Sequence, residues 1–487
     1  MKEIINNELS SNIDENLNYI KELLKDNMDV VYRSFYCGEF KAAIIYIDGM
    51  TDKILLDDYA LESLMLYKND IKNVEDIKDN LLTVTDVKEE EKLEIALRFL
   101  LAGDSLMLLD GIKKAYILGT RAWQARGVSE PSAETVIRGS RDGFVETIRF
   151  NTVLLRRRVR DTRLRLEMQN VGVRSKTDIA IAYIDDIVNK EVLEDVKNRI
   201  KKITIDAVLD SGYVEQLIED NKWSIFPQIQ STERPDVAAA AIYEGRIAIM
   251  VDNSPFCILV PATLPMLFQS PDDYYQRWIY SSIMRFIRFF GTILSLILPA
   301  LYVAVTSFST TILPNRLTYS IAATREGIPF PAYLEAIIME ISLAILVESV
   351  IRLPKALGST VGIVGGLIIG QAAVSAGIVS PVMIIIVSIT AITTFMTPNY
   401  EVVASLRIIR IALIIASTVI GLYGIALVLI IVLIHVIRLE SFGVPYLSPF
   451  VNVHKKDLKD SFVRSPIDQF IRRPEFIKPG DKVRQKP

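Results

Sequence analysis

The chain has 487 residues with 55 basic and 58 acidic side chains, for a net charge of −3, and half of its residues are hydrophobic. A mean hydropathy of +0.30 is high for a soluble protein, while the 23% of charged residues exclude a chain that lies entirely in a membrane. The balanced charge gives no sign of a nucleic-acid partner. The two cysteines exclude a disulfide framework or a cysteine-rich metal site.

Charged residues are dense up to about Arg288, sparse from Phe289 to Ile437, and frequent again in the tail. This distribution predicts a soluble N-terminal half and a membrane-embedded C-terminal half. The chain opens with Met-Lys-Glu-Ile-Ile and has no apolar core after it, so we expect no signal peptide and a cytoplasmic N-terminal domain. Residues 1–30 are expected to form a variable N-terminal segment.

An internal repeat organises the soluble half. The strings AIIYIDGMTDKILLDD (Ala43–Asp58) and AIAYIDDIVNKEVLED (Ala180–Asp195) share a Tyr-Ile-Asp core, and each begins as an apolar strand and continues with helical spacing. A second matching pair is GDSLMLLD (Gly103–Asp110) and GRIAIMVD (Gly245–Asp252). The turn Asp252–Pro255 that follows predicts a hairpin.

These repeats predict two related α/β subdomains, at 31–120 and 175–265, joined by an Arg-rich helical connector at 121–174. Two lobes with a cleft between them can bind a small molecule, and they can equally serve as rigid assembly modules. We favour assembly, because no cluster of convergent polar groups stands out in either copy.

An all-α polytopic membrane domain is expected at 266–440. Its first span, Phe289–Phe308, has about 20 uncharged residues, which make a helix of about 30 Å and suffice to cross the hydrocarbon core. The basic residues before it place the soluble half in the cytoplasm by the positive-inside rule. Arg407 and Arg410 are interpreted as cytoplasmic in the same way. We therefore expect both termini in the cytoplasm, four or six crossings, and a basic cytoplasmic tail at 441–487.

The apolar run Ala332–Ile351 carries three glutamates, Glu335, Glu340 and Glu348. A carboxylate at the membrane centre costs about 2.5–3.5 kcal/mol, so each of them must face protein, water or the membrane surface. At about 100° per residue, Glu340 and Glu348 lie on neighbouring sides of the helix and Glu335 points away. They are candidate carboxylates of an ion path, or partners of Arg325 or Arg352 in ion pairs.

The next run, Val361–Ser380, is uncharged and rich in glycine. Gly362, Gly366 and Gly370 recur every four residues on one face, which favours close helix packing, and Gln371 lies beside that face. These four residues are candidates for lining a pore or for packing. The last apolar run, Ile411–Ile437, is longer than one upright span requires, and Gly421 and Gly424 are placed to break it into a hairpin.

Enzyme chemistry finds little support in the sequence. The only histidines, His435 and His454, lie outside the soluble half, which excludes a His-dependent catalytic site there. The chain has no GxGxxG or GxxxxGK[ST] phosphate loop and no HExxH motif. We therefore expect no catalytic residues, no cofactor and no bound metal.

Several strings, in this order, resemble the A subunit of GerA-type nutrient germinant receptors of endospore-forming bacteria. The resemblance covers all but about the first 35 residues. The strings are RGSRDGF (Arg138–Phe144), RSKT (Arg174–Thr177), ERPD (Glu233–Asp236), SPDDYY (Ser270–Tyr275), REGIPFP (Arg325–Pro331), IGQAAVSAGIVSP (Ile369–Pro381) and SFGVPYLSP (Ser441–Pro449). Arg141-Asp142-Gly143-Phe144 is closer to the related F protein of the SpoVA operon, whereas Arg325–Pro331 and Ile369–Pro381 favour a true A subunit.

The resemblance implies a multi-pass protein of the spore inner membrane that works with a transporter-like B subunit and a C-subunit lipoprotein. Such receptors respond to nutrients by committing the spore to germinate, and the A subunit is proposed to form a ring-shaped homo-oligomer that conducts cations. Our leading hypothesis is such a ligand-gated channel subunit. The alternatives are a non-conducting scaffold subunit, the F protein of the SpoVA operon, and, with the least support, a secondary transporter.

Overall fold

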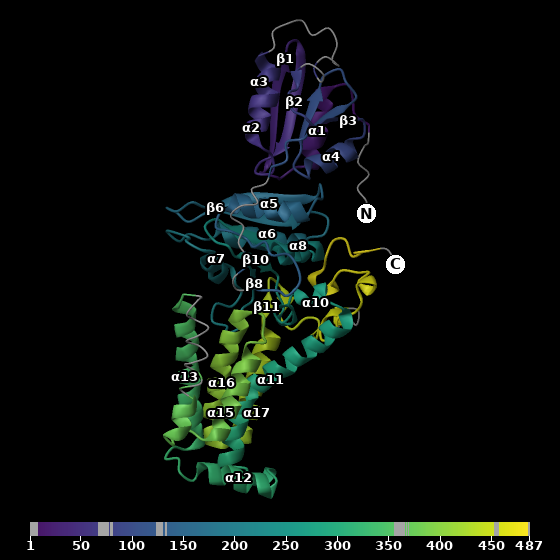
Figure 1. Cartoon of the computed structure of the whole chain (residues 1–487). Helices are drawn as coiled ribbons and strands as arrows, with labels where there is room; N and C mark the ends of the chain where they lie inside the picture. The colour runs from purple at the N-terminus through teal and green to yellow at the C-terminus, as the bar shows by residue number, and fades with distance from the viewer. Residues whose placement is uncertain are drawn as a thin grey trace.

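The computed structural model describes residues 8–66, 77, 81–122, 130–131, 134–354, 366, 368, 370–451 and 457–485. Two α/β units and a helical bundle follow one another along the long axis of the molecule (Figure 1). The first unit occupies one end, the second unit lies in the middle, and the bundle occupies the other end. The fold class expected from the sequence, a duplicated α/β domain followed by a helical domain, is confirmed.

The first α/β unit is built on an antiparallel sheet with the strand order β1-β2-β4-β5-β3. Helices α1 and α4 pack on one face, and α2, η1 and α3 pack on the other. The elements are α1 (Ile13–Leu23), β1 (Val30–Cys37), β2 (Phe40–Ile47), α2 (Lys53–Leu56), η1 (Asp57–Leu61), α3 (Glu62–Leu66), β3 (Val87–Glu90), α4 (Leu93–Leu100), β4 (Ser105–Leu109) and β5 (Ala115–Leu118).

The second unit repeats this plan with the order β6-β7-β9-β10-β8. Helices α5 and α8 cover one face, and α6 and α7 cover the other. The elements are α5 (Ile148–Arg158), β6 (Leu164–Val171), β7 (Thr177–Ile184), α6 (Lys190–Lys201), α7 (Ser211–Ile218), β8 (Gln230–Thr232), α8 (Pro235–Glu244), β9 (Ile247–Val251) and β10 (Cys257–Val260).

The duplication extends to individual hydrogen bonds. The backbone N–H of Ile13, at the start of α1, donates to Asp110 Oδ1 at 3.1 Å, and that of Ile148, at the start of α5, donates to Asp252 Oδ1 at 3.0 Å. Asp110 and Asp252 close the second pair of repeated strings. The hairpin expected after Asp252 is present between β9 and β10. Each repeat therefore begins with a helix that the matching strings do not contain.

These first elements lie outside the subdomain boundaries expected from the sequence. Helix α1 lies within 1–30, and both α5 and β6 lie within the expected connector 121–174. For β6, the physical reason is that it is an edge strand. Because an edge strand is only partly buried, polar residues such as Glu167 and Gln169 interrupt its apolar pattern.

The two units are joined through a buried arginine of α5. The Arg156 side chain is fully buried, its Nη2 donates to Asp29 Oδ1 at 2.9 Å, and it also donates to Asn27 Oδ1 at 2.8 Å. Next to it, the backbone N–H of Met28 donates to Leu166 O of β6 at 3.2 Å. The first unit thus rests on α5 and the edge of the second sheet.

The bundle follows two short helices that connect it to the second unit. The two connecting helices, the helices of the bundle, and the short 3-10 and strand segments that follow them along the chain have the following bounds. They are α9 (Leu264–Leu267), α10 (Asp272–Tyr275), α11 (Trp278–Ser307), η3 (Thr310–Ile312), α12 (Asn315–Arg325), α13 (Ala332–Arg352), a helical stretch at 370–375, α15 (Pro381–Thr394), α16 (Tyr400–Ile420), α17 (Leu422–Arg438), β11 (Glu440–Ser441), β12 (Val444–Pro445), η4 (Asp457–Asp460), η5 (Ile467–Gln469) and η6 (Glu475–Ile477).

Two helical stretches of the described chain are long and apolar enough to cross a membrane, Trp278–Ser307 and Tyr400–Arg438. The second is a hairpin of α16 and α17. A Cβ at Gly424 would lie 2.2 Å from Ala416 O, and Gly421 turns the chain with a φ of +62°. The hairpin expected at these glycines is therefore present. The number of crossings, four or six, stays a prediction.

The basic tail folds back onto the second α/β unit (Figure 1). The Nε of Arg473 donates to Tyr243 O at 2.7 Å, the N–H of Gly480 donates to Ile187 O at 2.9 Å, and Ser441 Oγ donates to Gln228 O at 2.7 Å. The described parts of the tail, 441–451 and 457–485, are thus part of the packed structure near the junction of the second unit and the bundle.

Candidate functional site

Glu335 is fully buried in the first turn of α13. Its Oε2 accepts a hydrogen bond from the N–H of Ser380 at 2.8 Å, and its Oε1 lies 3.2 Å from Nη2 of Arg325. The carboxylate therefore connects the end of α12, the start of α13 and the residue before α15. A buried carboxylate with an arginine and a backbone donor is neutralised locally. This geometry supports the ion-pair alternative for Glu335.

Glu340 forms a second buried ion pair further along α13. Its Oε1 lies 2.7 Å from Nη1 of Arg410, and the two residues are 4% and 1% exposed. Arg410 also donates to Ser295 O at 2.7 Å and to Thr394 Oγ1 at 2.8 Å, so four helices meet at one guanidinium. Arg410, interpreted from the sequence among the cytoplasmic charges, lies inside the bundle, where Glu340 supplies its countercharge.

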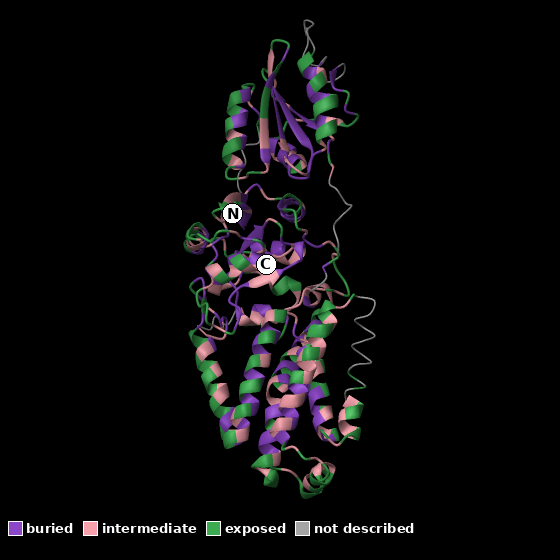
Figure 2. Cartoon of the chain, turned by 90° about the vertical axis from the view of Figure 1, so that its left-hand side faces the viewer, coloured by how far each residue is buried: buried purple, intermediate pink, exposed green. Residues whose placement is uncertain are grey.

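Glu348 is exposed and pairs with Arg352 one turn later, at 2.6 Å. The helical phase of the three glutamates placed Glu340 near Glu348 and turned Glu335 away, but the structure buries Glu335 together with Glu340. The partners on neighbouring helices, rather than the phase along α13, decide which carboxylates are buried. Along α13 the exposed residues begin at Ile341, and Figure 2 shows buried, intermediate and exposed residues mixed on the helices of the bundle.

The glycine-rich face lies beside α13 and α15. Gly362 falls outside the described residues. A Cβ at Gly366 would meet only Leu346 Cδ2, at 3.9 Å, and one at Gly370 would meet Ile384 at 3.8 Å, among the described residues. Gly366 and Gln371 are exposed. At Gly366 and Gly370, this face is therefore open rather than tightly packed against the other described residues.

A loop of the second α/β unit reaches the open ends of the α16–α17 hairpin. Ser224 Oγ lies 3.1 Å from His435 Nε2 of α17, and Ser405 Oγ of α16 donates to Ile225 O. The Phe226 side chain is 5% exposed and belongs to the core of the bundle. This joint connects the second α/β unit to both helices of the hairpin. Sequence reasoning missed it, because the loop at 221–226 is too short to show a helical or strand period.

Buried carboxyl groups gather at the same joint. Burial and the nearby Glu401 charge raise the pKa of Glu215, and burial raises the pKa of Glu219. Burial, followed by Glu219 and Glu401, also raises the pKa of Tyr446, whose hydroxyl has no hydrogen-bond partner among the described residues. No group of His, Cys, Asp and Glu in the described chain is arranged to hold a metal ion. The raised pKa values mean that Glu215 and Glu219 hold their protons to a higher pH than exposed carboxyl groups do.

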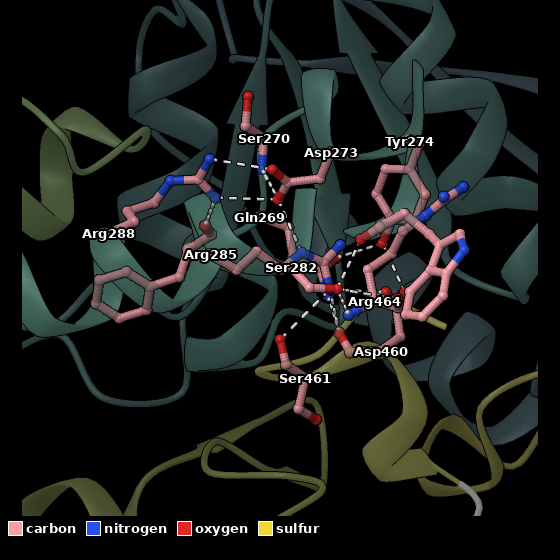
Figure 3. Close-up of polar contacts among 12 residues, drawn as sticks. Gln269, Ser270, Asp273, Tyr274, Ser282, Arg285, Arg288, Asp460, Ser461 and Arg464 are labelled. Atoms are coloured by element: carbon pink, nitrogen blue, oxygen red, sulfur yellow. Dashed lines mark hydrogen bonds and ion pairs between the residues drawn. The ribbon is translucent and has the colours of Figure 1, made fainter. Parts of the chain in front are cut away.

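The start of α11 carries a further polar cluster, formed with α10 and the tail (Figure 3). Asp273 is 2% exposed, and its Oδ2 accepts hydrogen bonds from Nε of Arg285 at 2.9 Å and from Nη1 of Arg288 at 3.0 Å. Arg285 also donates to Asp460 Oδ1 at 2.8 Å. The two arginines, interpreted from the sequence as topology signals, thus connect the tail to the first helix of the bundle.

Comparison with known proteins gives full-length matches. The model of the family described as Bacillus/Clostridium GerA spore germination protein matches residues 18–476. Spore germination protein GerLA of Bacillus cereus is 39% identical over 98% of both chains, and spore germination protein KA of Bacillus subtilis is 41% identical over 98% of this chain and 89% of its own. Stage V sporulation protein AF of Bacillus subtilis is 32% identical over 94% of this chain and 93% of its own.

A solved structure also matches the soluble half. It is the crystal structure of the N-terminal domain of the A subunit of the Bacillus megaterium spore germinant receptor GerK3. The two chains are 37% identical, the match covers 53% of this chain and 97% of that domain, and the TM-score is 0.43.

Proposed function

This chain belongs to the GerA family of spore germination proteins, and on that premise we propose that it is the A-type membrane subunit of a nutrient germinant receptor that forms a ring of identical copies and conducts cations. Relatives named as spore germination proteins reach 39–41% identity, above the 32% of stage V sporulation protein AF. This difference supports an A-type role over that of the F protein.

The observation that carries the channel proposal is the open face beside α13. Gly366 and Gln371 are exposed on a segment that the sequence places at membrane depth, and Gly366 has only Leu346 within 4 Å of its Cβ position among the described residues. A primary amide in lipid lacks hydrogen-bond partners and so favours a protein or water neighbour. A neighbouring copy packed against this face would satisfy it and would bring glycines and amides around a shared axis.

We assign the three glutamates different roles within this proposal. Glu335 and Glu340 are neutralised inside one chain, so they stabilise the bundle and set no net charge along an ion path. Glu348, exposed beside Arg352, is the one of the three that can face a path or a neighbouring copy. Selectivity for cations then depends on Glu348 and on polar groups such as Gln371.

The partners and location follow from the family role. We propose a transporter-like B subunit and a C-subunit lipoprotein as partners, and the spore inner membrane as the location. The N-terminal units lie in the cytoplasm in this proposal, where their duplicated fold serves as an assembly module. The position of the first unit at the end of the molecule supports this use, because it leaves that unit exposed to partners (Figure 1).

The test is cation release from liposomes that contain the purified full chain, alone and with its receptor partners. We expect flux that Gly366→Leu largely abolishes, because a bulky side chain would fill the open face. Gly327→Leu is the matched control, since a Cβ at Gly327 meets no atom within 4 Å among the described residues. Equal flux in both variants, or a strictly monomeric chain in native mass spectrometry, would contradict the channel.

A non-conducting scaffold is the second candidate. It is favoured by the two buried ion pairs, Glu335–Arg325 and Glu340–Arg410, which make the bundle a rigid support. The same liposomes separate the two functions. A chain that assembles with its partners but releases no cations under any nutrient would establish the scaffold.

A further inference from the structure

The first half of α11 has its apolar side outside and its polar side inside. The exposed side chains follow one side of the helix, whereas Ser281, Arg285 and Thr292 lie on the buried side, at 2%, 4% and 5% exposure. An apolar helix face without protein cover is typical of contact with lipid. The exposed residues are Trp278, Ile279, Tyr280, Ile283, Phe286, Ile287 and Phe290.

Tryptophan and tyrosine at the start of this face place it at the level of the lipid head groups. Trp278 and Tyr280 are 42% and 47% exposed, and such residues concentrate at membrane–water interfaces. The helix then continues into the bundle (Figure 1). The polar cluster on its buried side therefore lies where the phosphates of a bilayer would be.

That cluster contains more buried positive than negative charge. Arg285 and Arg288 share Asp273, and Arg285 also reaches Asp460. A third arginine, Arg464 of the tail, is 2% exposed and has no carboxylate within ion-pair distance among the described residues. Of these three guanidinium groups, that of Arg464 alone has no carboxylate as an ion-pair partner among the described residues.

Arg464 is fixed in this position by α11. Its backbone N–H donates to Ser282 Oγ at 3.1 Å, and Ser282 Oγ donates to the carbonyl oxygen of Arg464 at 3.1 Å. Its guanidinium lies 5.8 Å from the centre of the Tyr274 ring, and that of Arg285 lies 5.3 Å from the centre of the same ring. Figure 3 shows Arg464, Tyr274 and Arg285 gathered at the base of α11.

Several donors at this point have no acceptor in the described chain. They are Nε and Nη2 of Arg464, Nη2 of Arg285 and the hydroxyl of Ser281. Buried donors of charged groups strongly favour a partner. A phosphate group supplies both the missing negative charge and several acceptor oxygens, and the fork of an arginine matches it in two-point contact.

We propose that Arg464, Arg285 and Ser281 bind the phosphate of an anionic phospholipid at the base of α11. The lipid chain would lie along the exposed apolar side of the helix, and the head group would hold the tail against α11 through Arg464. This site does not depend on whether the protein conducts ions.

The test is titration of the full chain in detergent with phosphatidylglycerol, followed by native mass spectrometry. Phosphatidylcholine is the zwitterionic lipid control, and inorganic phosphate is the free-anion control. We expect one phosphatidylglycerol bound about tenfold or more tightly by the unmodified chain than by Arg464→Gln. Arg472→Gln is the matched control, because Arg472 is exposed in the same tail and pairs with Glu475.

Ser281→Ala keeps the charges and provides a second variant if Arg464→Gln does not fold, with an expected loss of about threefold. Unchanged lipid binding in folded Arg464→Gln and Ser281→Ala would overturn the site. Equal displacement by inorganic phosphate would overturn the lipid assignment, because the ligand would then come from solution.

Discussion

The two α/β units have one topology and different surroundings. The first unit lies at the end of the molecule, whereas the second is held between the first unit and the bundle (Figure 1). Their sheets and helix layers correspond element by element. The differences lie in the outer contacts, where the second unit has Phe226 of a loop in the bundle core and Arg156 of α5 paired with Asp29 of the first unit. The two copies thus share a core plan, and the second copy carries the contacts to both neighbours.

Removing the contact to the bundle should have the largest effect. Phe226→Ala deletes a ring that is 5% exposed, and such truncations cost about 3–5 kcal/mol. We expect faster hydrogen exchange in the loop at 221–226 and at both open ends of the hairpin, with the first unit unaffected. Trp223→Ala, in the same loop but 95% exposed, should stay within about 0.5 kcal/mol of the unmodified chain. Equal effects of the two variants would show that the joint does not depend on Phe226.

The contact between the units should rank second. Arg156→Met removes the partner of Asp29, whose side chain is 13% exposed. Loss of one partner of a buried pair costs about 3–5 kcal/mol, and we expect about 3 because Asp29 keeps some solvent. Limited proteolysis should then separate the two units sooner than in the unmodified chain. The exposed Arg160→Ala should leave the cleavage rate unchanged.

Equivalent positions in the two units should respond alike. Gly103 and Gly245 have φ values of +106° and +101°, and a Cβ would lie 3.0 Å from Met50 O and 3.2 Å from Ile187 O, respectively. Alanine in this region costs about 1–2 kcal/mol. We expect each substitution to destabilise its own unit by that amount in hydrogen exchange. Gly212→Ala, where the Cβ has ordinary contacts and no positive φ is required, should cost nothing measurable. A difference above about 1 kcal/mol between the destabilisation by Gly103→Ala and that by Gly245→Ala would contradict the equivalence of the two units.

The smallest effect should be a pH dependence that only the second unit shows. The pKa of Glu215 is raised in the folded protein, chiefly by burial and then by Glu401. Its contribution to stability is therefore complete below the pKa of an exposed carboxyl and is lost as pH rises through the raised value. We expect the thermal midpoint of the joint to fall between about pH 6 and about pH 9.

Glu215→Gln provides the comparison, since an amide is uncharged at every pH. Its midpoint should fall less over the same range, and the gap between the two proteins should widen with pH. Parallel curves of thermal midpoint against pH would indicate that ionisation of Glu215 does not destabilise the joint.

Local patterns predicted much of the fold. The Tyr-Ile-Asp strings mark β2 and β7, the strings that end at Asp110 and Asp252 mark β4 and β9, and Gly421 with Gly424 marks the hairpin turn. These signals are local, because burial on both faces demands continuous apolar residues and a tight turn demands glycine. The edge strands β1 and β6 gave no such signal, since one side of an edge strand tolerates polar residues.

The candidate site was predictable only in part. Glu335, Glu340 and Glu348 stand out in an apolar run, so their need for partners follows from the sequence. Which partner each one takes does not, because Arg410 lies seventy positions after Glu340 along the chain. The joint around Phe226 and the cluster around Arg464 gave no pattern, since each brings together segments that are far apart in sequence.

The sequence by itself determined the division into a charged α/β half and an apolar helical half, the duplication, and the family, because composition and periodicity are properties of neighbouring residues. Only the tertiary structure decided which charges neutralise one another and which stay without a partner. The energy of a buried charge depends on what lies within a few ångströms of it, and the folded chain sets that distance.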